Sequence, residues 1–252
     1  MISVISPAKS LNFKINSSIN TQTIPKYIAE SNELITLCKK LSVTDIQRIM
    51  NISDKLSELN YKRFQEFKNQ TQKQAIFAYD GDVYNNINKY DFTSKQLDFL
   101  QNHILIISGL YGLLRPLDTI RPYRLEMSTK LPDSRDLYHY WESIITNYLN
   151  SLLAKHTTKY LINLASIEYS SVINKKILKY PIITIHFKEN KHGKLKTAGI
   201  NAKKARGMMI DYIVKHSIDD PKALKDFNYA GYEYNKNTST ESDLLFTTKV
   251  FT

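Results

Sequence analysis

The chain has 252 residues, with 35 Lys and Arg against 24 Asp and Glu, which gives a formal net charge of +11. Hydrophobic residues make up 42% and charged residues 23%, close to globular averages, and this excludes an intrinsically disordered chain. The length suits one large domain or two small ones. Because Cys38 is the one cysteine, no intrachain disulfide can form, and we expect a reducing, cytoplasmic location.

Two further classes are excluded by the hydropathy pattern. The first residues lack the basic and apolar regions of a signal peptide. No run approaches the roughly 18 apolar residues that a membrane span requires. We therefore expect no membrane partner.

The positive charge is unevenly distributed. Between Lys155 and Lys225 there are fifteen Lys and Arg against five acids. A basic pI of about 9.4 with a local basic block favours a polyanionic partner, since bound cations release counterions from a nucleic acid. A biased base composition would also enrich Lys, so the charge alone leaves both explanations open.

In the first part of the chain, strands are predicted at Ile2–Ile5 and Ala75–Tyr79. Three helices are predicted between them, at Pro25–Leu41, Thr44–Met50 and Ser53–Phe67. In the middle part, Thr93 is predicted to cap a helix, and a strand is predicted at Ile104–Ser108. A long helix is predicted at Asp136–Leu153, followed by two strands at Tyr160–Leu164 and Ile182–Phe187.

The last part predicts a strand over Lys194–Ile200 that pairs back through a turn at 190–193. A helix from Ala202 to about His216 follows, capped by Asn201, and then a terminal hairpin of Tyr229–Tyr234 and Leu244–Val250. No repeat or linker divides the chain. The sequence therefore predicts a single α/β (α+β) domain over residues 1–252, with a mixed β-sheet flanked by helices.

A helical hairpin over about residues 43–67 resembles the helix-hairpin-helix DNA-binding motif. In that motif, a turn of two glycines presents backbone amides to a phosphate at the start of the second helix. Here Asn51 and Ser53 stand in place of the glycines, and Lys55 follows them. Asn tolerates left-handed backbone and Ser is a good N-cap, so the turn can still form. An ordinary helical hairpin remains the alternative.

An arginine-rich segment follows the strand that ends at Ser108. Arg115, Arg121 and Arg124 lie within ten residues of one another in a chain that is otherwise rich in Lys. Arg presents a planar fork to phosphate or carboxylate, which Lys cannot match. Pairing with Asp118 or Glu126 to lock the loop is an equal alternative.

A third cationic segment lies at the start of the helix near Ala202. Lys203, Lys204 and Arg206 occupy its first turns, where the helix dipole disfavours cations. A bound phosphate would offset that repulsion, whereas a merely solvated face is the alternative. Lys203 and Arg206 are three residues apart and share one side of the helix.

Four loop residues complete the candidates. Ser6, Lys9, Asp82 and Ser166 follow predicted strands, and Asn163 lies at the end of one. Loops beyond strand ends are where open sheets place their sites. We therefore expect them to share one cleft, which the charge predicts to be basic. The six histidines show no metal-ligand spacing and no nucleotide-binding motif is present, so no metal or cofactor is predicted and no catalytic residue can be named.

Seven segments, in this order, resemble the YaaA family of bacterial peroxide-stress proteins: Ser6–Lys9, Ile52–Leu56, Gly81–Tyr84, Ser108–Asp118, Pro122–Met127, Asn163–Ser166 and Ala202–Gly207. The resemblance implies a family-specific α/β fold with a basic cleft, binding to DNA, and protection against iron-dependent oxidative damage. Two departures are Ile167, where an acid is expected, and Gly199–Asn201, where an aromatic residue is common.

Three hypotheses follow. In the first, the protein binds the phosphate backbone of double-stranded DNA without strong sequence preference. In the second, it is an enzyme that acts on a phosphorylated or nucleic-acid substrate in the same cleft. The third, direct binding of iron, finds little support in the His and Cys content, although carboxylates could serve. The oligomeric state is not determined, and a monomer is favoured.

Overall fold

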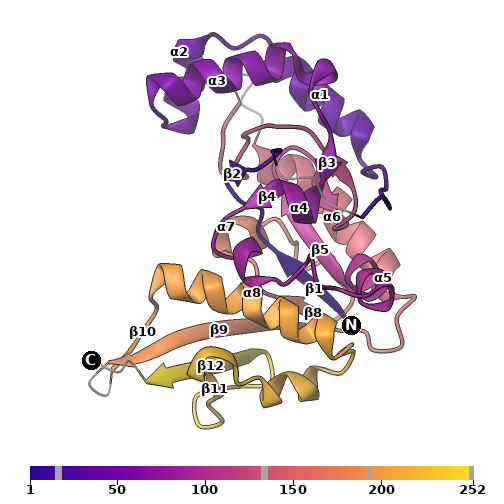
Figure 1. The fold of residues 1–252 in the computed structure, drawn as a ribbon, viewed down its shortest axis with the longest axis vertical. Coiled ribbons are helices and arrows are strands. Elements are labelled where there is room, and N and C mark those ends of the chain that lie inside the picture. Colours follow the sequence, from indigo (N-terminus) through magenta and orange to yellow (C-terminus); the bar gives the residue numbers. More distant parts are fainter. Residues whose placement is uncertain (15–18, 132–135, 192–193, 250–252) are drawn as a thin grey trace.

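A computed structural model describes residues 1–14, 19–131, 136–191 and 194–249. Within these, eight strands form the main sheet, in the order β11-β12-β9-β8-β1-β5-β6 with β10 paired to β9 (Figure 1). The strands are β1 (Ile2–Ile5), β5 (Ile104–Ser108), β6 (Gly112–Leu114), β8 (Leu161–Asn163), β9 (Ile182–Lys191), β10 (Lys194–Lys196), β11 (Glu233–Tyr234) and β12 (Asp243–Lys249). The predicted mixed sheet flanked by helices, in a single domain, is confirmed.

The centre of the sheet is parallel. Strand β1 lies between β5 and β8, with Val4 opposite Leu105 on one side and Asn163 on the other. β9 pairs in parallel with β8 and with β12, whereas β6, β10 and β11 pair antiparallel at the margins. All four residues of β1, including Ser3, are buried, as expected of a strand that is covered on both faces.

The helices are α1 (Ile28–Cys38), α2 (Val43–Met50), α3 (Asp54–Gln65), α4 (Ala75–Ala78), α5 (Ser94–His103), α6 (Leu137–Leu153), α7 (Ile167–Ser170) and α8 (Gly199–Lys215). Short 3₁₀ turns are η1 (Phe67–Asn69), η2 (Tyr84–Asn86), η3 (Pro221–Asp226) and η4 (Tyr229–Gly231). Figure 1 shows α1, α2 and α3 at one end of the molecule and β9 to β12 at the other. No helix in the described ranges is long and apolar enough to cross a membrane.

Two small sheets lie outside the main one. Strand β2 (Ser10–Leu11) pairs with β4 (Tyr79–Asp80), and β3 (Lys73–Gln74) pairs with β7 (Thr119–Ile120). The strand predicted over Ala75–Tyr79 is wrong, because residues 75–78 form α4. Each side chain of α4 is buried, and a short apolar run that is buried all round looks the same in sequence whether it is helix or strand.

Several capping predictions can be compared with the structure. Thr93 caps α5 through a capping box, as predicted, and Asp136, the predicted start of the long helix, caps α6 by accepting from the Tyr138 amide. The predicted cap at Asn201 is wrong, because α8 begins at Gly199 and Asn201 donates to Glu189 instead. β10 correspondingly ends at Lys196. Of the turn predicted at 190–193, residues 190 and 191 belong to β9 and the rest lie outside the described residues.

Candidate functional site

A cavity of about 300 Å³ lies beyond the carboxyl end of β1. Its lining comes from the segment after β1, the segment 80–84 around η2, the segment after β8, and α8. Four of the seven segments that carry the family resemblance thus meet at one place. The structure brings together there six of the predicted residues, which are Ser6, Lys9, Asp82, Ser166, Lys203 and Arg206.

Ser6 and Ser166 meet because β1 and β8 are parallel neighbours that end at the same edge of the sheet. The backbone amide of Ser166 donates to Ser6 Oγ at 2.8 Å, and Ser6 Oγ in turn donates to Ser166 Oγ at 3.2 Å. The Tyr84 hydroxyl donates to the Ser6 carbonyl oxygen at 2.8 Å, which fixes this loop from below. The two hydroxyls are therefore held in place at the cavity wall.

Helix α8 brings its cations to the cavity through a close backbone contact. A Cβ atom added to Gly207 would lie 2.0 Å from the Val83 carbonyl oxygen, so only glycine lets α8 approach this turn. Lys203 and Arg206 precede Gly207 on the same helix and line the cavity. Burial lowers the pKa of Arg206, and among the described residues its Nε has no hydrogen-bond partner.

The charges of the cavity wall are balanced. Three cations, Lys9, Lys203 and Arg206, are matched by three carboxylates, Asp80, Asp82 and Glu168. The sequence predicts a basic cleft, whereas the cations and carboxylates that line this cavity are equal in number. Asp82 is one of the predicted cleft residues, whereas Asp80 and Glu168 are not among them. A mixed lining is typical of a site that binds a polar ligand in a defined orientation.

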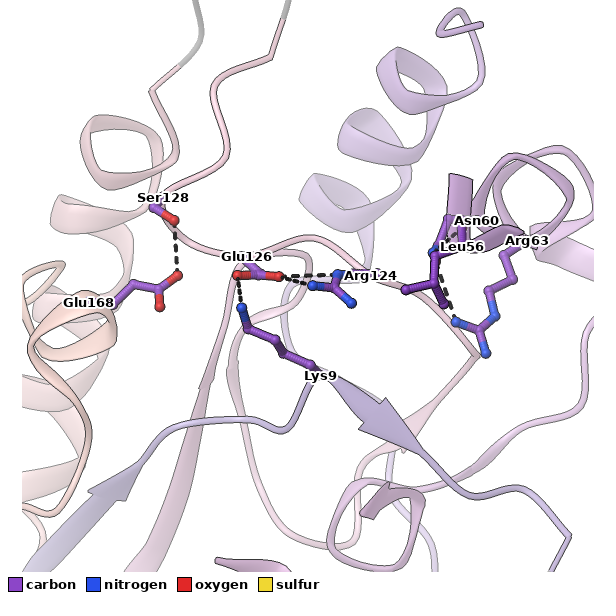
Figure 2. A network of polar contacts seen from close by, with 8 residues as sticks. All are labelled: Lys9, Leu56, Asn60, Arg63, Arg124, Glu126, Ser128 and Glu168. Atoms are coloured by element: carbon purple, nitrogen blue, oxygen red, sulfur yellow. Dashed lines mark hydrogen bonds and ion pairs between the residues drawn. The ribbon is translucent and has the colours of Figure 1, made fainter. Parts of the chain in front are cut away.

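Glu126 binds two of the predicted cations at the rim of the cavity (Figure 2). Its Oε1 accepts from Arg124 Nε at 3.1 Å and from Nη2 at 2.8 Å, while its Oε2 lies 2.8 Å from Lys9 Nζ. Both the Arg124 and Glu126 side chains are mostly buried. For Arg124, the alternative that it locks its own loop thus agrees with the observed contacts.

Arg63 of α3 is a cation that the sequence argument missed. It lies beside Arg124, and burial together with this neighbouring charge lowers its pKa (Figure 2). Arg63 Nη1 donates to Asn60 Oδ1 at 3.3 Å, and no carboxylate within the described ranges pairs with it. No local signal marked it, because Arg63 follows Lys62 on an ordinary helix and its neighbour Arg124 is distant in sequence.

The turn between α2 and α3 has the backbone that its sequence predicted. Asn51 adopts left-handed φ and ψ of 48° and 59°. Ser42 caps α2 through a capping box, whereas in the described structure Ser53 makes no side-chain hydrogen bond to α3. The first amides of α3 consequently remain available, with exposed Lys55 in the same turn.

The other predicted residues lie away from the cavity lining. Lys204 is exposed on α8, and the half-buried Arg121 stacks its guanidinium 5.7 Å from the Phe67 ring centroid. The backbone amide of Arg115 donates to Asp118 at 2.8 Å, so that segment forms a closed loop. Asn163 is buried, and its Oδ1 accepts from the Ala165 amide at 3.0 Å, which shapes the turn after β8.

Glu168 and Tyr169 line the cavity although the sequence argument did not select them. Ile167, which stands where an acid was expected, is 84% exposed and points away. The acid next to it, Glu168, instead reaches the cavity and accepts from Ser128 Oγ at 3.0 Å. The expected acid is therefore supplied one residue later, because the first turn of α7 rotates that position inward.

Comparison with known proteins gives one family model and several relatives of similar length. The family model described as "Peroxide stress protein YaaA" matches residues 1–238. A UPF0246 protein of Rickettsia bellii (strain OSU 85-389) is 52% identical over 246 residues, covering 98% of this chain and 99% of the relative. UPF0246 proteins of Rickettsia rickettsii (strain Iowa) and Rickettsia felis are each 51% identical with the same coverage. The chain therefore belongs to the YaaA family of peroxide stress proteins.

Proposed function

We propose that this protein acts in the peroxide stress response by binding the phosphate backbone of double-stranded DNA, and so limits iron-dependent oxidative damage to it. The family description supports the role in peroxide stress. The observation that carries the DNA contact is the amino end of α3. Ser53 occupies the N-cap position of α3, but within the described ranges its side chain makes no capping hydrogen bond to the first amides of the helix. These amides follow the left-handed turn at Asn51.

The charges around α3 support the same proposal. Lys55 is exposed at the first turn, and Arg63 is a partly buried cation farther along the helix. Asp54, the acid of the first turn, contacts the Gln47 side chain and so ties α3 to α2. A phosphate at this turn would meet backbone amides and a Lys side chain, which hold DNA without reading bases.

The test is the salt dependence of binding to a short fluorescent duplex, measured by anisotropy. With about four phosphate contacts, Kd should rise roughly 100-fold between 50 and 200 mM salt. Lys55→Glu should weaken binding about 10-fold for unrelated sequences. Lys95→Glu, an equal charge reversal at an exposed position of α5, should change it less than about 2-fold. An affinity that does not vary with salt would refute the proposal.

A second candidate function is catalysis on a phosphorylated or nucleic-acid substrate in the cavity. The specific observation that favours it is the buried Arg206 Nε, which lacks a partner in the described part of the chain and lies in a wall with two linked serine hydroxyls and three carboxylates. Ser166→Ala and Arg206→Lys should abolish turnover of DNA ends or nucleotides, whereas Lys55→Glu should alter only binding. Absence of turnover by the unmodified protein would exclude this candidate.

A further inference from the structure

Two histidines and one aspartate meet at the amino edge of the sheet, at the opposite ends of β1 and β8 from the cavity. His103 is the last residue of α5, His156 precedes β8, and Asp219 follows α8. One ligand atom from each lies within 4.8 Å of the other two. The residues come from three distant parts of the chain, which is why spacing along the sequence showed no metal motif.

The Met1 ammonium group contacts this cluster. The Met1 ammonium donates to Asp219 Oδ1 and lies 3.3 Å from His156 Nδ1. Because an ammonium group has only donors, this Nδ1 must act as an acceptor, and the neutral ring carries its proton on Nε2. His156 also forms a hydrogen bond with the backbone of Asn102, a contact of the kind that orients histidine ligands.

His103 is held in place beside it. Its ring stacks on Phe99 with a centroid separation of 3.8 Å, and Nδ1 lies 2.8 Å from the Met1 carbonyl oxygen and 3.5 Å from Asp219 Oδ1. Burial lowers the pKa of both rings, that of His156 to about 4. Among the described residues, two charged groups act on these rings, the Met1 ammonium and the Asp219 carboxylate.

We propose that His103, His156 and Asp219 bind one Zn²⁺ ion, with the Met1 α-amine as the fourth donor. Imidazole nitrogens and a carboxylate oxygen are ordinary zinc ligands, and four protein donors make a closed, structural site. Ligands about 2.1 Å from a tetrahedral ion are roughly 3.4 Å apart, so the widest separation would have to shorten by about 1.4 Å.

Metal binding would replace protons and hydrogen bonds of the cluster with bonds to the ion. The ammonium releases one proton to solvent when its nitrogen lone pair binds the ion. His103 Nδ1–H donates to the Met1 carbonyl oxygen, so this proton has to move through solvent to Nε2 before the Nδ1 lone pair can bind the ion. The bound ion would then tie the start of the central strand β1 to α5, to the segment before β8 and to the segment after α8. Its effect is on stability, because the cavity lies at the other edge.

The test is calorimetric titration of the full chain with ZnCl₂, after removal of metals with a chelator and with any affinity tag placed at the C-terminus and free of histidine. We expect one equivalent of Zn²⁺ with a Kd of roughly 1 µM or below. The midpoint of thermal unfolding should rise by roughly 5 °C or more at 100 times Kd. No binding at about 100 µM Zn²⁺ would overturn the proposal.

Matched variants locate the ion. His156→Gln should weaken binding at least roughly 100-fold, whereas His139→Gln, at a histidine whose side chain is 89% exposed on α6, should leave it unchanged. Equal affinities for these two variants would overturn the proposal. Adding two residues before Met1 moves the amine away and should weaken binding about 10-fold without any side-chain change. Replacing Zn²⁺ by Co²⁺ should give the visible absorption of a four-coordinate ion, and its absence would contradict the closed site.

Discussion

The two edges of the parallel sheet differ in whether their charged groups have partners within the protein. At the carboxyl edge, segments after β1 and β8 carry hydroxyls, three cations and three carboxylates around a cavity. At the amino edge, the Met1 ammonium is held by one carboxylate and two histidines. The carboxyl edge leaves polar groups without internal partners, as at Arg206 Nε among the described residues, whereas the amino edge pairs its buried ammonium.

This difference separates binding from stability. An edge whose polar groups lack protein partners can bind an external ligand, since the ligand completes hydrogen bonds that folding left open. An edge whose charges are paired internally contributes to holding the strands together. The comparison predicts that substitutions at the amino edge change the free energy of unfolding and leave DNA binding unchanged.

The largest effect is expected at the contact that forms the carboxyl edge. Gly207→Ala places a Cβ against the Val83 carbonyl oxygen, so α8 must move, and we expect unfolding to become easier by about 3 kcal/mol in urea titration. Gly199→Ala on the same helix is the matched control, because its Cβ would meet nothing within 4 Å. Equal stability of the two variants would show that the close approach of α8 is not required.

The amino edge is tested by Asp219→Asn in the presence of a chelator. The variant removes the carboxylate that pairs with the partly buried Met1 ammonium, and we expect a loss of about 2 kcal/mol of unfolding free energy. Duplex binding should remain within about 2-fold, because Asp219 is not part of the α2–α3 turn that we propose contacts DNA. Asp98→Asn, at an exposed position of α5, serves as the control. A large loss of DNA affinity would remove the distinction between the edges.

A third prediction concerns a buried cation next to the carboxyl edge. Lys89 is 5% exposed and donates to the Tyr84 carbonyl oxygen at 3.0 Å, and burial lowers its pKa to about 8. Between that value and the ordinary value of the unfolded chain, the unfolded state holds more protons, so stability due to Lys89 rises with pH. Below pH 8 the ammonium is charged in both states and its burial is most costly.

The measurement compares the unmodified protein with Lys89→Met at about pH 7.5 and pH 10. The difference in unfolding free energy should move in favour of the unmodified protein by roughly 1 to 2 kcal/mol as pH rises. Lys95→Met at an exposed position should show almost no such change. A difference between the proteins that is constant with pH would mean that the buried ammonium carries its ordinary pKa.

The smallest effect is expected at the α2–α3 turn. Asn51 has a φ of 48°, so Asn51→Gly should leave stability nearly unchanged, whereas Asn51→Val should cost about 1 to 2 kcal/mol. If the turn binds phosphate, Asn51→Val should also weaken duplex binding, and Asn51→Gly should not. Loss of DNA affinity with both substitutions would indicate a role for the Asn side chain itself.

Local sequence signals predicted most elements. The sequence predicts Thr93 as an N-cap, Asp136 as the start of a helix, and strands at Ile2–Ile5 and Ile104–Ser108, because caps and periodicity depend on neighbours in sequence. Ala75–Ala78 was misassigned, since its environment comes from segments distant in sequence. The cap at α8 was misplaced for a related reason, because Asn201 has a partner on β9.

The sequence by itself determined the fold class, the family and the order of the segments that would approach one another. Only the tertiary structure decided the character of the sites. It put three carboxylates among the cations of the cavity, placed Arg63 beside Arg124, and brought His103 to His156 and Asp219. The physical reason is that caps and hydrophobic periodicity act between near neighbours, whereas charge balance and ligand geometry depend on distances set by strand order.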